Sequence, residues 1–71
     1  MITLADMDNW FSYHPPTPED LPAYEAMRAA ARAFAECVIV NTVPSADQTT
    51  AIRKIREASM AANQARACNR A

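Results

Sequence analysis

The sequence contains no glycine among its 71 residues. This excludes glycine-rich phosphate-binding loops such as the P-loop and the GxGxxG turn. One histidine and two separated cysteines, Cys37 and Cys68, give no metal-ligand spacing. With a single histidine, the sequence indicates no Ser–His–Asp or Cys–His catalytic set. We therefore expect no cofactor, no metal site, no catalytic residue and no enzymatic activity.

Long apolar runs are also absent. No stretch is long enough to span a bilayer, and residues 1–20 lack the basic start of a secretory signal. We expect a cytosolic protein whose two cysteines are reduced and buried by packing, with a catalytic thiol as the alternative for either. A chain of 71 residues forms one domain at most, and chains this short usually need a further source of stability such as oligomerisation.

Net charge is small, at −1, but it is unevenly distributed. Residues 1–25 carry five Asp or Glu and no Lys or Arg, whereas residues 46–71 carry five Lys or Arg against Asp47 and Glu57. The acidic and basic ends can pair between subunits, or the basic end can meet an anionic ligand. For each single charge, the alternative is a solvated helix face.

Two helices are predicted. Thr17 is a good N-cap and Pro18 is tolerated at the first helical position, which predicts a helix over about 18–40. Its apolar residues recur every three or four positions and form a helical stripe: Tyr24, Met27, Ala31, Phe34 and Val38. Residues 37–40 are rich in β-formers but continue this stripe, so we expect them to be its last turn.

The second helix follows a short connection. Pro44 ends the first helix, and Ser45 with Gln48 fits a capping box, which predicts a helix over about 46–68. Small residues make a seam along it: Ala51, Ile55, Ala58, Ala62 and Ala65. Residues 4–10 suit a short extra helix within the N-terminal segment 1–16. The expected fold is all-α, a single antiparallel helical hairpin over residues 1–71.

Apolar residues exceed what one helix pair can bury. The larger ones cannot all face a single seam: Met27, Phe34, Ile39, Ile52 and Met60. The surplus predicts a compact homo-oligomer.

Two stretches carry a family resemblance. One is residues 11–16 (FSYHPP), followed ten residues on by residues 25–28 (EAMR); the other is residues 54–63 (KIREASMAAN), which is similar to K-L-E-E-A-x-M-W-A-N. Over roughly residues 10–66 the chain resembles the phage anti-CBASS type 2 proteins. These are cyclic-oligonucleotide sponges that share a hairpin domain with the Thoeris anti-defence type 1 proteins.

The resemblance implies a homo-hexamer of hairpins in the cytoplasm of an infected bacterial host. It implies binding of cyclic dinucleotides, and in some members of cyclic trinucleotides at a separate site, without cleavage. Sequestering these signals would suppress CBASS antiviral defence. For the Thoeris relatives the ligands are cyclic ADP-ribose isomers. DNA and membranes are not among the expected partners.

A sponge needs aromatic platforms and cations rather than acids, bases or nucleophiles. By the resemblance, Tyr13 is the stacking ring and Arg28, where some members have Lys, is the phosphate partner. Arg28 would lie about 15 Å along a helix that starts near Pro18, so we expect Tyr13 to meet Arg28 of a neighbouring subunit. Ser12 and His14 are further ligand candidates, with loop ordering as their alternative role. Trp10 and Phe11 are expected to pack.

Other features remain open at this point. A second anion site can form about a symmetry axis from four basic residues: Lys54, Arg56, Arg66 and Arg70. Ala61 stands where the family often has Trp, which can enlarge a pocket or weaken a subunit contact. Alternative functions are a protein–protein inhibitor or assembly module and a DNA-binding hairpin. A pI of about 5.6 argues against the last.

Overall fold

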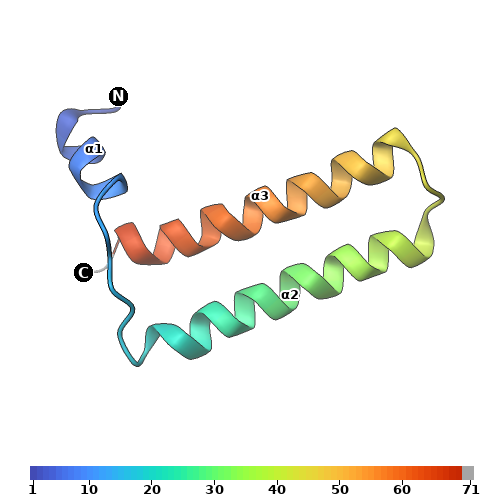
Figure 1. Ribbon diagram of the computed structural model, residues 1–71, viewed down its shortest axis with the longest axis horizontal. Helices are drawn as coiled ribbons and strands as arrows, with labels where there is room; N and C mark the ends of the chain where they lie inside the picture. The colour runs from blue at the N-terminus through green and yellow to red at the C-terminus, as the bar shows by residue number, and fades with distance from the viewer. Residues whose placement is uncertain (70–71) are drawn as a thin grey trace.

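A computed structural model describes residues 1–69, which form three helices and no strand (Figure 1). Helix α1 spans Leu4–Trp10, α2 spans Asp20–Asn41 and α3 spans Ala46–Cys68. Helices α2 and α3 lie antiparallel and side by side, joined by residues 42–45, while α1 contacts α3 at the opposite end. The expected all-α hairpin with a short N-terminal helix is confirmed.

The starts of α1 and α3 are set by capping hydrogen bonds. The Thr3 amide donates to Asp6 Oδ2 at 2.7 Å and the Asp6 amide donates to Thr3 Oγ1 at 3.2 Å, which is a complete capping box. At α3, Ser45 Oγ accepts from the Gln48 amide at 3.1 Å, as predicted. The Gln48 side chain does not complete the box; its Nε2 instead donates to Thr42 Oγ1 at 3.1 Å.

Helix α2 starts two residues later than predicted. A turn precedes it, in which the Asp20 amide donates to the Thr17 carbonyl at 3.0 Å and the Thr17 amide donates to Asp20 Oδ2 at 2.7 Å. Pro22 is tolerated in the first turn because an amide there has no intrahelical acceptor. The helix includes residues 37–40, as expected, and ends at Asn41, after which Thr42 is extended with φ −134°.

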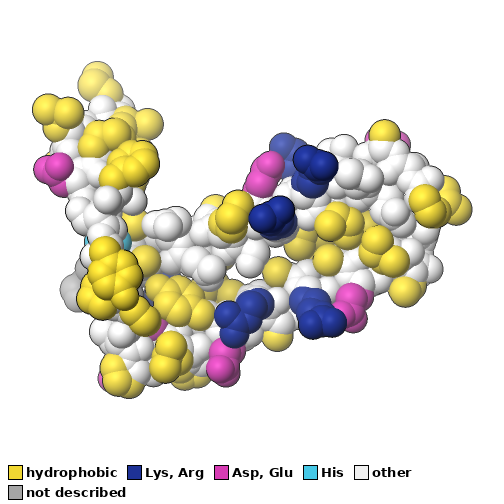
Figure 2. All heavy atoms as spheres, viewed as in Figure 1, with side chains coloured by type: hydrophobic (Ala, Val, Ile, Leu, Met, Phe, Trp, Pro, Cys, Tyr) yellow, Lys and Arg dark blue, Asp and Glu magenta, His cyan; other side chains and the backbone are white. Residues whose placement is uncertain are grey.

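The hairpin has no buried apolar side chain among residues 1–69. Most of the predicted stripe on α2 is half-buried, but Phe34 remains 61% exposed. Figure 2 shows apolar side chains along the hollow between the two long helices. Two helices alone cover one stripe each, so this surplus was expected from the sequence.

The molecule is correspondingly open. Its accessible surface is 5773 Å², whereas a compact protein of 7.8 kDa would expose about 4,400 Å². Its radius of gyration is 15.2 Å, against about 11 Å for a compact domain of this length. This geometry favours assembly with other chains, and the homo-oligomer itself stays a prediction.

Two further observations concern the backbone and the helices. No residue in the described range has a positive φ, and no peptide bond there is cis. No helix formed by residues 1–69 is both long enough and apolar enough to cross a membrane.

Candidate functional site

The segment between α1 and α2 lies at one end of the hairpin (Figure 1) and carries two exposed aromatic side chains. The Tyr13 side chain is 83% exposed and Phe11 is 82% exposed. A ring this accessible can stack on a flat base. The expected packing role of Phe11 is not seen within one chain, whereas Trp10 is more covered, at 43% exposed.

The two polar residues that flank Tyr13 bond to α1. Ser12 Oγ donates to the Asp8 carbonyl, and His14 Nε2 donates to the Asn9 carbonyl at 2.6 Å. Both acceptors lie in the last turn of α1, where carbonyls lack intrahelical partners. Within the described chain, Ser12 and His14 therefore order the loop. Their direct contact with a ligand stays a prediction.

Asn9 joins this loop to the end of α3. Its Nδ2 donates to the Cys68 carbonyl at 2.8 Å, and Cys68 Sγ lies 3.9 Å from the Asn9 carbonyl. Sequence reasoning missed Asn9, because no local pattern links residues 59 positions apart.

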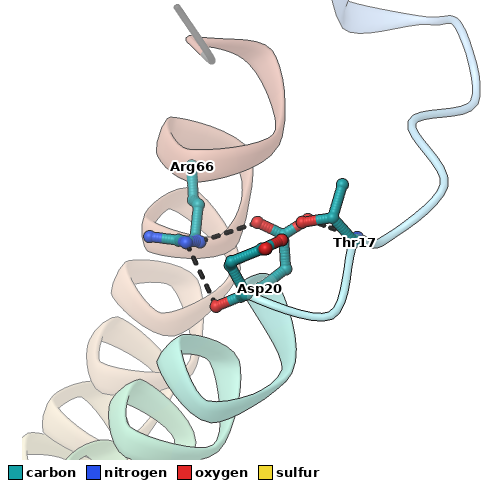
Figure 3. Close-up of polar contacts among 4 residues, drawn as sticks. Thr17, Asp20 and Arg66 are labelled. Carbon is teal, nitrogen blue, oxygen red and sulfur yellow. Dashed lines mark hydrogen bonds and ion pairs between the residues drawn. The ribbon is translucent and has the colours of Figure 1, made fainter.

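Arg66 lies in an ion pair that fixes the entry into α2 (Figure 3). Its Nε donates to Asp20 Oδ1 at 2.9 Å, and its Nη2 donates to the Glu19 carbonyl at 3.2 Å. The Asp20 side chain is 3% exposed and the Arg66 side chain 39% exposed. In this chain the guanidinium of Arg66 is thus engaged with α2, and its proposed part in a second anion site stays a prediction.

Arg28 is exposed and makes no hydrogen bond or ion pair within residues 1–69. In particular, no ion pair with Glu25, three positions earlier on the same helix, is present there. By contrast, Arg32 Nε lies 2.7 Å from Glu36 Oε1. Figure 2 shows Lys and Arg side chains on both long helices on the viewed face, on either side of the hollow. Arg28 thus offers an unneutralised cation on the surface of α2.

The hollow between α2 and α3 is an apolar groove of about 580 Å³. Met27 and Phe34 line it from α2, and Ile55 and Lys54 from α3. Lys54 Nζ lies 3.6 Å from Glu57 Oε2, with both side chains exposed. Of the other predicted anion-site residues, Arg56 is exposed on α3. Arg70 lies outside the described residues.

A smaller hollow lies beside Ala61. Its volume is about 490 Å³, and Trp10, Ala61 and Cys68 are among the residues that line it. Ala61 therefore borders an open space next to the single tryptophan of the chain.

Within one chain the two main candidates for ligand binding, Tyr13 and Arg28, lie on separate elements. Tyr13 precedes α2, and Arg28 lies about 12 Å along that helix from Asp20. Neither side chain makes a hydrogen bond within residues 1–69. In the same range no three His, Cys, Asp or Glu side chains gather as a metal site would require. One chain therefore presents the aromatic ring of Tyr13 on the loop before α2 and the cation of Arg28 on α2 itself.

Comparison with known proteins identifies one family. The family model "Acb2/Tad1, hairpin domain" matches residues 4–67, which include all of α1 and α2 and nearly all of α3. No curated protein and no solved structure matches the chain.

Proposed function

The chain belongs to the Acb2/Tad1 hairpin-domain family, and on that premise we propose that it is an anti-defence sponge. It binds cyclic nucleotide signals of bacterial immunity and holds them without cleaving them. More specifically, we propose that a phage encodes it, that its main ligands are cyclic dinucleotides, and that it acts in the cytoplasm of the infected host to suppress CBASS. Cyclic trinucleotides and cyclic ADP-ribose isomers are further candidate ligands.

The observation that most supports the proposal is the exposure of the Tyr13 side chain. A side chain that is 83% exposed on a segment held by its neighbours is a preformed platform for a base. Base–aromatic stacking contributes roughly 1–3 kcal/mol per base. Because Arg28 has no ion-pair partner in residues 1–69, binding a phosphate there would not first break an existing pair.

The separation of Tyr13 and Arg28 supports a site shared between subunits. The homo-oligomer, which we propose to be a hexamer, would bring Tyr13 of one chain to Arg28 of another. The same assembly would cover the exposed apolar side chains, among them Phe34, Ile39 and Met60. Burial of such surface is the main driving force of stable association.

The deciding experiment combines binding with recovery of the ligand. Purified protein is titrated by calorimetry with cyclic dinucleotides, cyclic trinucleotides and cyclic ADP-ribose isomers. The protein is then digested, and the released ligand is identified by mass spectrometry. We expect saturable binding of at least one cyclic dinucleotide and its recovery intact. Absence of binding across the panel, or recovery of a hydrolysed product, would contradict the proposal.

A second candidate function uses the apolar groove to bind another protein. The groove lined by Met27, Phe34 and Ile55 favours it, since helices commonly dock into such surfaces. This function predicts a stable complex with a protein other than the chain itself and no affinity for any cyclic nucleotide.

A further inference from the structure

The C-terminal ends of two helices meet at Asn9. Its side chain donates to the Cys68 carbonyl at 2.8 Å, which belongs to the last turn of α3 and has no intrahelical partner. The Cys68 sulfur also lies near α1, 3.9 Å from the Asn9 carbonyl oxygen. Asn9 is thus hydrogen-bonded to an otherwise unpaired carbonyl at the end of α3, whereas the Cys68 thiol has its shorter contact with Gln64 Oε1, at 3.1 Å.

The Asn9 carbonyl also contacts the loop between α1 and α2, which carries Tyr13. It accepts from His14 Nε2 at 2.6 Å, and His14 is the residue next to Tyr13. On the other side of Tyr13, Ser12 bonds to α1 as well. Tyr13 has no hydrogen bond of its own within residues 1–69, so its placement depends on these two neighbours.

Apolar burial does little to hold this end of the molecule. Leu4 is 84% exposed and Ile2 is 65% exposed, so the apolar cover comes from Met7, which is half-buried, and from Trp10, which is 43% exposed. A helix of seven residues is not stable by itself. The polar junction with Cys68 is therefore a main determinant of where α1, and with it the loop, lies.

We propose that Asn9 is a positioning residue of the ligand site. Through Cys68 it fixes α1 on α3, and through His14 it fixes the backbone beside Tyr13. The ring is then held in place before the ligand arrives, which lowers the ordering cost of binding. As far as the ligand is concerned, this inference rests on the proposed sponge function.

The first test compares two substitutions of the same chemistry. Asn9→Asp keeps the shape of the side chain, removes the donor and sets a negative charge against the Cys68 carbonyl. Asn63→Asp makes the same change at an exposed asparagine of α3. With cyclic GMP–AMP and cyclic di-AMP as probes, Asn9→Asp should bind about tenfold more weakly than the wild type, as loss of one hydrogen bond predicts. Asn63→Asp should bind like the wild type.

The second test separates positioning from stability at His14. Replacing His14 by Gln keeps an N–H donor at this position, whereas replacing it by Phe keeps a ring but removes the donor. We expect His14→Gln to bind within about threefold of the wild type, and His14→Phe to be weakened as much as Asn9→Asp. A purely structural role would instead make affinity follow the unfolding midpoint. Equal affinity of the two His14 variants, or wild-type affinity of Asn9→Asp, would overturn the inference.

A third measurement needs no ligand. Hydrogen exchange of the amides of residues 12–14, together with Trp10 emission, reports on the loop and on α1 in the free protein. In Asn9→Asp the amides of residues 12–14 should exchange faster and the Trp10 emission should shift to the red. Neither change is expected in Asn63→Asp. If the wild type binds no cyclic nucleotide, the sponge function fails, while unchanged exchange in Asn9→Asp would overturn the role of Asn9 separately.

Discussion

Arg66 and Asp20 join the last turns of α3 to the first turn of α2, with Nε 2.9 Å from Oδ1 and the carboxylate side chain 3% exposed. The pair spans 46 positions of the chain and closes the end of the hairpin opposite the turn at residues 42–45. Because Asp20 Oδ2 also accepts from the Thr17 amide, one carboxylate fixes both the helix pair and the proline-rich entry (Figure 3).

The ion pair predicts a clear loss of stability. Arg66→Ala removes the guanidinium from a buried carboxylate and should lower the free energy of unfolding by about 2 kcal/mol. Arg32→Ala makes the same change in the exposed pair with Glu36 and should cost less than about 0.5 kcal/mol. Urea unfolding at matched chain concentration measures both. Equal losses would mean that burial of Asp20 does not strengthen the pair.

A shared ligand site predicts complementation between defective subunits. Tyr13→Ala and Arg28→Ala should each abolish cyclic dinucleotide binding, because one lacks the stacking ring and the other the phosphate partner. When the two proteins are unfolded together and refolded as a mixture, some interfaces regain both groups, and part of the binding should return in calorimetry. A site built within one chain would give no recovery in the mixture.

The proposed assembly predicts sensitivity to charge in the groove. Phe34→Glu places a carboxylate where an apolar contact between chains is expected, so sedimentation should show smaller species than the wild type. Val43→Glu is the matched control, since Val43 is 75% exposed at the turn, away from the residues that line the groove. Identical sedimentation of the Phe34→Glu variant and the wild type would exclude the groove as a subunit contact.

The hollow at Ala61 predicts a stabilising substitution. Ala61→Phe adds a ring beside Trp10 in a space of about 490 Å³, so the free energy of unfolding should rise by roughly 1 kcal/mol. Trp10 remains the single tryptophan, and its emission should shift to the blue as its surroundings become less polar. Ala33→Phe, on an exposed position of α2, should leave the emission unchanged. A red shift in Ala61→Phe would mean that the ring displaces α1.

The sequence was sufficient for the helices because their signals are local. The apolar stripe from Tyr24 to Val38, the serine cap at Ser45 and the proline that follows α2 each depend on residues a few positions apart. The capping box of Thr3 and Asp6 has such a signal too, Thr-x-x-Asp, and the prediction of a helix over residues 4–10 did not use it. Helix α2 starts later than predicted because Asp20 bonds back to Thr17 and forms a separate turn.

The polar contacts at the site could not be predicted in the same way. Asn9 with Cys68 and Asp20 with Arg66 are 59 and 46 positions apart, so no spacing rule connects them. Patterns of residue type also gave no means to decide whether Ser12 and His14 face a ligand or the end of α1. The family resemblance selected Tyr13 and Arg28, and the structure adds that each is exposed and that one chain does not bring them together.

The backbone of residues 1–69 has no positive φ, so no described position requires a residue that tolerates left-handed geometry. Side chains rather than backbone conformation therefore limit which substitutions the hairpin accepts. Few positions are constrained from within a single chain, chiefly the helix caps and the two long-range polar junctions. Substitutions at other positions of residues 1–69 consequently remove few contacts within one chain, and the helices can persist through them.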